Sequence, residues 1–168
     1  MILSNYKNKD YNIRKEVAND KDCPVYILKK LSNDENKAVV IAVLNNLNCP
    51  VNVLKRFSTH VDSDFRTNVA RNGNCPVEIL EFLLNDKFYL VKLAVAKNEK
   101  CSAFILEKLS DEDDFMIIHS IVKNESCPYY ILRKIYKMIS NNSLNINGLN
   151  YYLFKIKQHP NWELKDFE

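Results

Sequence analysis

Apolar residues return along this chain at a fixed interval, and polar residues fill most positions between them. When the sequence is written in rows of 26 residues, the same columns are apolar in all five rows. Two columns, four residues apart, hold Ile13, Val39, Phe65, Val91 and Ile117, and then Val17, Val43, Val69, Val95 and Ile121. The remaining columns hold Ile27-Leu28, Val53-Leu54, Ile79-Leu80, Ile105-Leu106 and Ile131-Leu132, and then Leu31, Phe57, Leu83, Leu109 and Ile135. A period of this length predicts a stacked-repeat protein.

The spacing of these columns predicts two helices in each repeat. The later columns lie three and four residues apart and define one face of a helix of about ten residues. The two earlier columns predict a shorter element of about two turns, either an α-helix or a 3₁₀ helix. Because one such pair of helices cannot bury its apolar face alone, neighbouring repeats must share a continuous core. The sequence therefore predicts an all-α solenoid of about five repeats.

A column of cysteines marks the start of the longer helix. Each cysteine is 26 residues from the next, and four of the five are followed by proline. The column holds Cys23, Cys49, Cys75, Cys101 and Cys127, followed by Pro24, Pro50, Pro76, Ser102 and Pro128. Proline is favoured in the first turn of a helix, where its missing N–H would have no partner and its φ is already helical. Each cysteine is therefore expected at a polar corner just before a helix.

The repeat pattern also sets the expected boundaries of the chain's parts. We expect one repeat domain over residues 1–168, with five repeats over 11–140. Residues 1–10 are interpreted as the remnant of an incomplete repeat, and 141–168 as a divergent C-terminal cap that begins with a loop. Within this cap, Tyr151-Tyr152-Leu153-Phe154 predicts a helix covering the last repeat. His159-Pro160-Asn161-Trp162 resembles one more corner, with Trp162 in the place of the cysteine.

The columns resemble the leucine-rich repeat variant family, whose repeats follow the pattern Val-Arg-x-x-Val-Ala-x-Asn-x-x-(Thr/Ser)-Pro-x-x-x-Leu-x-x-Leu-(Ala/Ser)-x-Asp. The first repeat here reads Ile13-Arg14-Lys15-Glu16-Val17-Ala18-Asn19-Asp20-Lys21-Asp22-Cys23-Pro24, then Leu28, Leu31-Ser32 and Asp34. The third reads Phe65-Arg66, Val69-Ala70, Asn72, Cys75-Pro76, Leu80 and Leu83. The resemblance covers roughly residues 11–140 and departs in two ways, since cysteine replaces Thr/Ser and the repeats are longer.

The resemblance implies a right-handed superhelix in which α-helices alternate with 3₁₀ helices. It implies no shared catalytic activity. A cysteine-rich iron–sulfur segment known in this family is not expected here, because no cysteine precedes Cys23.

The cysteine column favours a structural role over a metal or redox site. The chain has no C-x-x-C pair, which is the usual spacing of metal-binding cysteines. Stacked helices lie about 8–10 Å apart, whereas a disulfide needs Cα atoms within about 6.8 Å. We therefore expect small, buried side chains and no cofactor. A second column, three residues before the cysteine, holds Asn46, Asn72, Asn98 and Asn124, and is expected to bond backbone groups of the corner rather than a ligand.

Basic residues form the surface pattern that bears most on function. The formal net charge is only +3, which is weak evidence for a nucleic-acid partner. One basic column holds Arg14, Arg66 and Lys92, and another holds Arg71, Lys97 and Lys123. Stacked repeats would turn each column into a candidate binding stripe that could follow phosphates. The alternative is that these residues are ordinary solvated side chains.

No catalytic set is visible in the sequence. His60, His119 and His159 occupy different columns, and none has a nucleophile at a spacing typical of a triad. The chain has only two glycines, too few for a glycine-rich phosphate loop. No apolar run approaches the ~20 residues of a membrane span, and no secretion signal is apparent. The expectation is a cytoplasmic, non-enzymatic scaffold that holds a protein or peptide on the curved face formed by the shorter helices. Nucleic-acid or other polyanion binding is the alternative.

Overall fold

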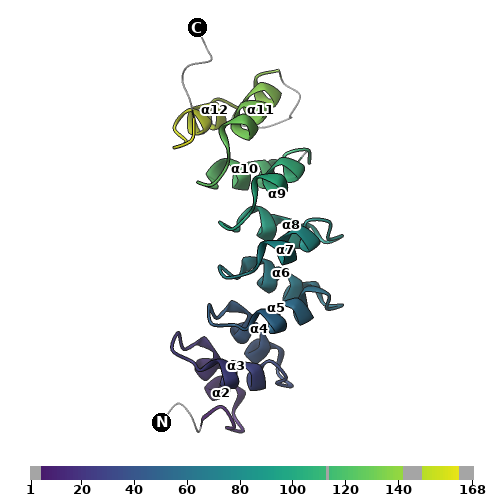
Figure 1. Ribbon diagram of the computed structural model, residues 1–168, viewed down its shortest axis with the longest axis vertical. Helices are drawn as coiled ribbons and strands as arrows, with labels where there is room; N and C mark the ends of the chain where they lie inside the picture. The colour runs from purple at the N-terminus through teal and green to yellow at the C-terminus, as the bar shows by residue number, and fades with distance from the viewer. Residues whose placement is uncertain (1–4, 113, 142–148, 163–168) are drawn as a thin grey trace. The chain divides into compact units, whose positions relative to one another are not determined.

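The fold was analysed in a computed structural model that describes residues 5–112, 114–141 and 149–162 (Figure 1). Within these ranges the chain forms eleven α-helices and no β-strand. No helix among them is both long and apolar enough to cross a membrane. The chain divides into two compact units, Met1–Leu83 and Leu84–Glu168.

The N-terminal unit contains the first three repeats. In each repeat we call the helix before the cysteine the A helix and the helix after it the B helix. The A helices are α2 (Tyr11–Asn19), α4 (Lys37–Asn45) and α6 (Ser63–Arg71), and the B helices are α3 (Val25–Leu31), α5 (Val51–Ser58) and α7 (Val77–Leu83). α2 packs on α4, α4 packs on α6, and α5 packs on α7.

The C-terminal unit contains the last two repeats and the cap. Its A helices are α8 (Tyr89–Ala96) and α10 (Phe115–Lys123), and its B helices are α9 (Ala103–Leu109) and α11 (Tyr129–Ser140). The cap helix α12 (Leu149–Lys157) packs on both α10 and α11. The predicted all-α repeat with a 26-residue period is confirmed, and the handedness of the whole array stays a prediction. The predicted start of the N-terminal remnant (1–4) and most of the predicted loop (142–148) lie outside the described residues.

The lengths of the two helices differ from the prediction. The A helices have 8 or 9 residues and are α-helical, whereas the B helices of the first four repeats have 7 or 8. The A helices are longer because polar side chains cap them before the first apolar column: Asp10, Asn36 and Asp62 each accept a bond from a backbone N–H two residues on. The B helices are shorter because the proline is the N-cap, with extended ψ, and helical geometry begins one residue later.

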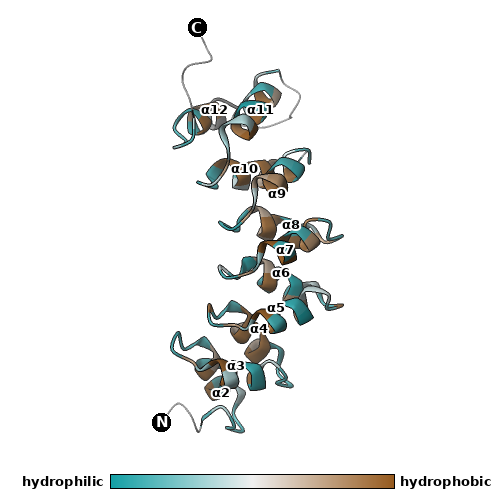
Figure 2. Ribbon diagram, in the orientation of Figure 1, coloured by the Kyte–Doolittle hydropathy of each residue, from teal (hydrophilic) through white to brown (hydrophobic). Residues whose placement is uncertain are grey.

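The predicted apolar columns form the core. Every side chain in them is buried except Ile13, which is partly exposed. Figure 2 shows the hydrophobic stretches on the helices and the hydrophilic residues at the corners. Each fully buried aliphatic side chain contributes about 1.5–3 kcal/mol relative to an exposed one, so these ladders supply most of the stabilising energy.

All five cysteines are buried, and none is joined in a disulfide bond. The backbone N–H of each donates to the carbonyl three residues earlier, which closes the corner before the B helix. Burial raises the pKa of the Cys49 and Cys127 thiols to about 12. Among the described residues, no group of three or more His, Cys, Asp or Glu side chains is placed so that it could hold a metal ion. The cysteines therefore act as small core residues at the corners.

The asparagine column joins each corner to the one before it. The Asn46 side-chain amide donates to the carbonyls of Ala18 and Asp20, both at 2.8 Å. In the next repeat, the Asn72 amide donates to Leu44 and Asn46 at 2.6 and 3.0 Å.

The same side chains also close their own corners. Oδ1 of Asn72 accepts from the backbone N–H of Asn74 at 2.8 Å, and equivalent bonds form at Asn46, Asn98 and Asn124. In the C-terminal unit, Asn124 donates to the carbonyl of Asn98 at 3.1 Å. We call this series of bonds the asparagine ladder.

A histidine continues the ladder into the cap. The His159 ring contacts the Asn124 carbonyl through Nε2 at 2.9 Å and accepts from the Asn161 backbone N–H through Nδ1 at 3.1 Å. The Trp162 backbone N–H donates to the His159 carbonyl at 2.9 Å, as each cysteine does in the repeats. Trp162 thus occupies the cysteine place, as the sequence predicted, and His159 occupies the asparagine place. These bonds place the N–H of neutral His159 on Nε2.

Replacing Asn72 by alanine is expected to destabilise the protein by about 1–3 kcal/mol, because buried backbone groups lose their partner. Urea unfolding followed by circular dichroism measures the change. Asn45→Ala is the matched control, since Asn45 is exposed at the end of α4, and it should change stability by less than about 0.5 kcal/mol. Equal midpoints for the two variants would contradict a structural role for the ladder.

The five thiols of the folded protein are expected to react slowly with a disulfide reagent such as dithiodipyridine. They are buried, and the raised pKa values of Cys49 and Cys127 leave almost no thiolate at neutral pH. The absorbance change on mixing gives the rate, and the urea-unfolded protein supplies the rate of free cysteine. Labelling of all five at the unfolded rate under native conditions would be inconsistent with burial at the corners.

Candidate functional site

The structure places the two predicted basic columns in different environments. Members of the first column lie within the A helices, and members of the second lie at the C-terminal ends of these helices. We call the first the inner basic row (Arg14, Arg66 and Lys92) and the second the outer basic row (Arg71, Lys97 and Lys123).

Arg14 of the inner basic row donates hydrogen bonds through Nε, Nη1 and Nη2. Its Nε and Nη2 donate to the two carboxylate oxygens of Asp34 at 2.6 and 2.8 Å. Its Nη1 donates to the carbonyls of Asn8 and Lys9. The two side chains are only 11% and 7% exposed, and the hydrogen bond from Arg14 lowers the pKa of Asp34. Arg14 therefore fastens the start of α2 to the end of the first repeat.

The other two members of this row are also engaged. Arg66 is buried and donates through Nη1 to the carbonyls of His60 and Val61 at 2.6 and 3.0 Å. Nζ of Lys92 lies 2.7 Å from both carboxylate oxygens of Glu112. The inner basic row is thus a set of structural contacts rather than an open stripe.

The outer basic row is exposed. Arg71 ends α6, Lys97 is the C-cap of α8, and Lys123 ends α10. Within the described part of the chain, the three side chains make no hydrogen bond or ion pair. Cations at a helix C-terminus are stabilised by its partial negative charge, which gives them a modest structural role. Arg71 belongs to the N-terminal unit, whereas Lys97 and Lys123 lie together in the C-terminal unit.

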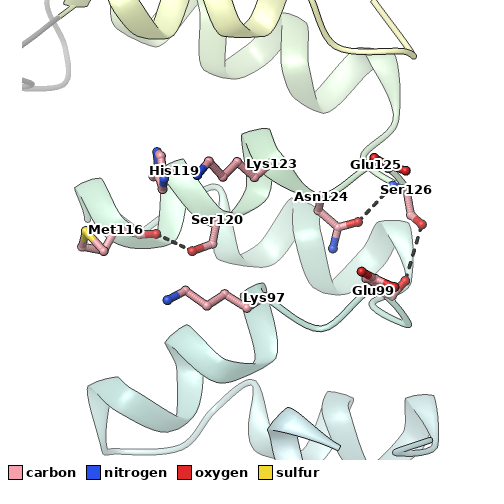
Figure 3. A pocket seen from close by; sticks show the side chains of 9 residues that line it. All are labelled: Lys97, Glu99, Met116, His119, Ser120, Lys123, Asn124, Glu125 and Ser126. Carbon is pink, nitrogen blue, oxygen red and sulfur yellow. Dashed lines mark hydrogen bonds between the residues drawn. The ribbon is translucent and has the colours of Figure 1, made fainter. Parts of the chain in front are cut away.

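Lys97 and Lys123 line a pocket of about 490 Å³ formed by α8, α10 and the corners that follow them (Figure 3). The lining residues are Lys97, Glu99, Met116, His119, Ser120, Lys123, Asn124, Glu125 and Ser126. In Figure 3 both lysine side chains extend toward the end of the pocket that holds Met116 and His119. Glu99 and Glu125 lie at the other end. The pocket therefore has a cationic and apolar end and an anionic end.

His119 is uncharged at neutral pH in this pocket. Burial, followed by the charges of Lys123 and Lys97, lowers its pKa from the ordinary value. Its ring stacks on Phe115, with centroids 6.2 Å apart and planes 22° from parallel. The positive charge at this end thus comes from the two lysines.

The polar groups of the pocket differ in whether they already have partners. The Ser120 hydroxyl donates to the Met116 carbonyl at 2.7 Å, and Asn124 belongs to the asparagine ladder. The carboxylates of Glu99 and Glu125, like the two lysine ammonium groups, make no hydrogen bond or ion pair within the described residues. Four charged groups therefore face solvent and can bind a ligand.

The two hydroxyl groups that line the pocket are already bonded to backbone. Ser120 donates to the Met116 carbonyl, and Ser126 donates to the Glu99 carbonyl. Two lysines can bind a carboxylate or phosphate through charge-assisted hydrogen bonds, and the two glutamates can bind a cation.

Two exposed apolar residues beside this row were not predicted from the sequence. Leu90 and Met116 are 57% and 40% exposed and occupy the same column in α8 and α10. Each stands seven residues before a lysine of the outer basic row, which is two helical turns away on the same face. The signal was present in the sequence, because this column holds polar or small residues in the first three repeats (Asn12, Ala38 and Asp64).

Removing the Arg14 pair tests whether the inner basic row is structural. Asp34→Asn is expected to lower the thermal midpoint by a few degrees, because a mostly buried guanidinium loses its charged partner. The lowered pKa of Asp34 means that the pair stabilises the protein at neutral pH and that this contribution fades as pH falls through the folded pKa. The difference between wild type and variant should therefore narrow in acid.

The control is Asp64→Asn, which removes a carboxylate whose side chain is 62% exposed. Its melting midpoint should stay close to that of the wild type. Midpoints lowered equally in both variants would argue against a special role for the Arg14 pair.

Comparisons with protein-family models, curated proteins and solved structures found no match to this chain.

Proposed function

We propose that this protein is a non-enzymatic, cytoplasmic scaffold that holds a protein or peptide on the face formed by its A helices. The observation that carries the proposal is the pocket of the C-terminal unit. There, Lys97 and Lys123 have no protein partner and lie on the same helical faces as exposed Leu90 and Met116. Exposed apolar side chains rimmed by polar groups mark surfaces that bind another chain.

The repeat architecture supports this proposal. Stacked repeats offer extended surfaces on which equivalent positions vary while the core stays constant. The A-helix face follows that rule, since the column of Leu90 and Met116 carries a large apolar residue only in the fourth and fifth repeats. We further propose membership of the leucine-rich repeat variant family, on the repeat residues quoted above.

Binding of nucleic acid or another polyanion is the second candidate, favoured by the exposed outer basic row. A polyanion gains affinity from many phosphate contacts along a continuous positive path. Two observations count against such a path. The inner basic row is engaged in structural contacts, as at Arg14 and Lys92, and the pocket places Glu99 and Glu125 close to the lysines.

Affinity capture with matched charge variants tests the proposal. The tagged full chain is used to recover partners from a native lysate, with and without nuclease, and mass spectrometry identifies them. We expect a protein partner that survives nuclease and moderate salt, and whose recovery falls about tenfold with K97E/K123E, since each reversed charge turns attraction into repulsion.

The control variant is K108E/K137E, which makes the same change in net charge on the exposed surfaces of α9 and α11. Its partner recovery should match the wild type. Material that disappears with nuclease, or binding that falls steeply with salt, would favour the polyanion function. Recovery lowered equally by both variants, or no partner at all, would count against the A-helix face.

A further inference from the structure

The A-helix face of the C-terminal unit changes in chemical character along the helix axes. Its apolar end carries Leu90 in α8 and Met116 in α10. Lys97 and Lys123 follow at the C-terminal ends, and Glu99 and Glu125 come two residues later in the corners. Because α8 and α10 pack on one another, equivalent residues of the two repeats form three parallel rows, apolar, positive and negative.

The pocket has no net charge bias, since two lysines and two glutamates line it. A nucleic-acid backbone that crosses the pocket would place phosphates beside the lysines and also beside the glutamates, which would repel them. A ligand that carries both signs of charge can satisfy all four groups. Charge complementarity therefore favours a zwitterionic segment over a polyanion.

We propose that this pocket selects a peptide segment that presents an apolar, an acidic and a basic side chain, in that order, along one face. The apolar side chain packs on Leu90 and Met116, the acidic one lies between Lys97 and Lys123, and the basic one meets Glu99 and Glu125. This inference rests on the proposed function and names the chemistry of its partner.

The dimensions suit an extended peptide. Seven residues separate Met116 from Lys123, which is about 10 Å along a helix. About three residues of extended chain span that distance, at ~3.3 Å each. The lysine side chains lean toward Met116 (Figure 3), which brings the apolar and cationic subsites closer together. Ligand residues two apart, whose side chains share a face of an extended chain, can therefore occupy neighbouring subsites.

His119 sits between the apolar and cationic subsites. It is uncharged at neutral pH, because burial and both lysines oppose its protonation. Its ring stacks on the ring of Phe115. Lys155 lines a neighbouring pocket together with His119, Lys123 and Glu125. An acidic group bound between the lysines offsets the repulsion that they exert on His119.

Selection from a peptide library tests the inference directly. A phage library of random dodecapeptides is panned against the full chain, and enriched sequences are synthesised and measured by fluorescence anisotropy. We expect enriched peptides to share the order apolar, acidic, basic. Lys97→Glu with Lys123→Glu should weaken their binding about tenfold, and Glu99→Lys with Glu125→Lys should do the same.

A charge-swapped protein provides the decisive control. Combining all four substitutions keeps the net charge of the chain and exchanges the two charged rows. This variant should recover binding to peptides whose acidic and basic residues have been exchanged, and should reject the original ones. All four residues are exposed, and thermal melting checks that each variant folds as the wild type does.

The outcomes separate this inference from the proposed function. Enriched peptides without the charge pattern, or a charge-swapped variant with unchanged preference, would overturn the inference and leave peptide binding in place. Enrichment of acidic peptides alone, displaced by single-stranded poly-thymidine, would overturn it in favour of a polyanion site. If no peptide is enriched over a blank surface, both the proposed function and this inference fail.

Discussion

An asparagine side chain carries both a donor and an acceptor, and this protein uses the two on opposite sides of its corners. Oδ1 closes the turn between an A and a B helix, and Nδ2 reaches carbonyls of the preceding repeat. Each polar corner of a helical repeat leaves backbone groups that must find partners when the next repeat covers them. The asparagine ladder supplies those partners at a fixed register, so the apolar columns of successive repeats meet.

Because the ladder fixes this register, some residues of each repeat are needed for the fold and others can vary. The two basic rows look alike in the sequence, but the inner basic row makes structural contacts. Arg14 pairs with Asp34, and Lys92 pairs with Glu112. Each pair links the A helix of a repeat to the corner that follows its B helix. The outer basic row makes no such contact within the described residues. In the C-terminal unit its members lie beside apolar and acidic residues, so this surface has an apolar, a positive and a negative part.

Most of the fold could be predicted from the sequence. Five copies of the same period show which positions are apolar in every repeat, even where a single repeat would be ambiguous. The apolar columns and the corners followed from it. Helix lengths were misjudged, because the Asp and Asn residues that cap the A helices lie outside the apolar columns. The place of His159 in the asparagine ladder was not predicted, because an imidazole differs in chemistry from the asparagine whose place it takes.

The candidate site was only partly readable. Lys97 and Lys123 were singled out in advance, but sequence alone could not distinguish them from Arg14, whose partner lies twenty residues away in the chain. Which side chains pair depends on where the corners place them in space. The spacing of the columns along the sequence does not show these positions. The exposure of Leu90 and Met116 was not predicted, although the column that they share holds polar or small residues in the first three repeats.

The bonds of the ladder all run in one direction. In every rung described, the side-chain donor belongs to the later repeat and the accepting carbonyl to the earlier one, as from Asn46 to Asp20 and from Asn72 to Asn46. A ribosome delivers about 5–20 residues per second, so a new repeat emerges within a few seconds of its predecessor. Each nascent repeat therefore finds its acceptors already made, and the array can grow by templated addition from its N-terminal side.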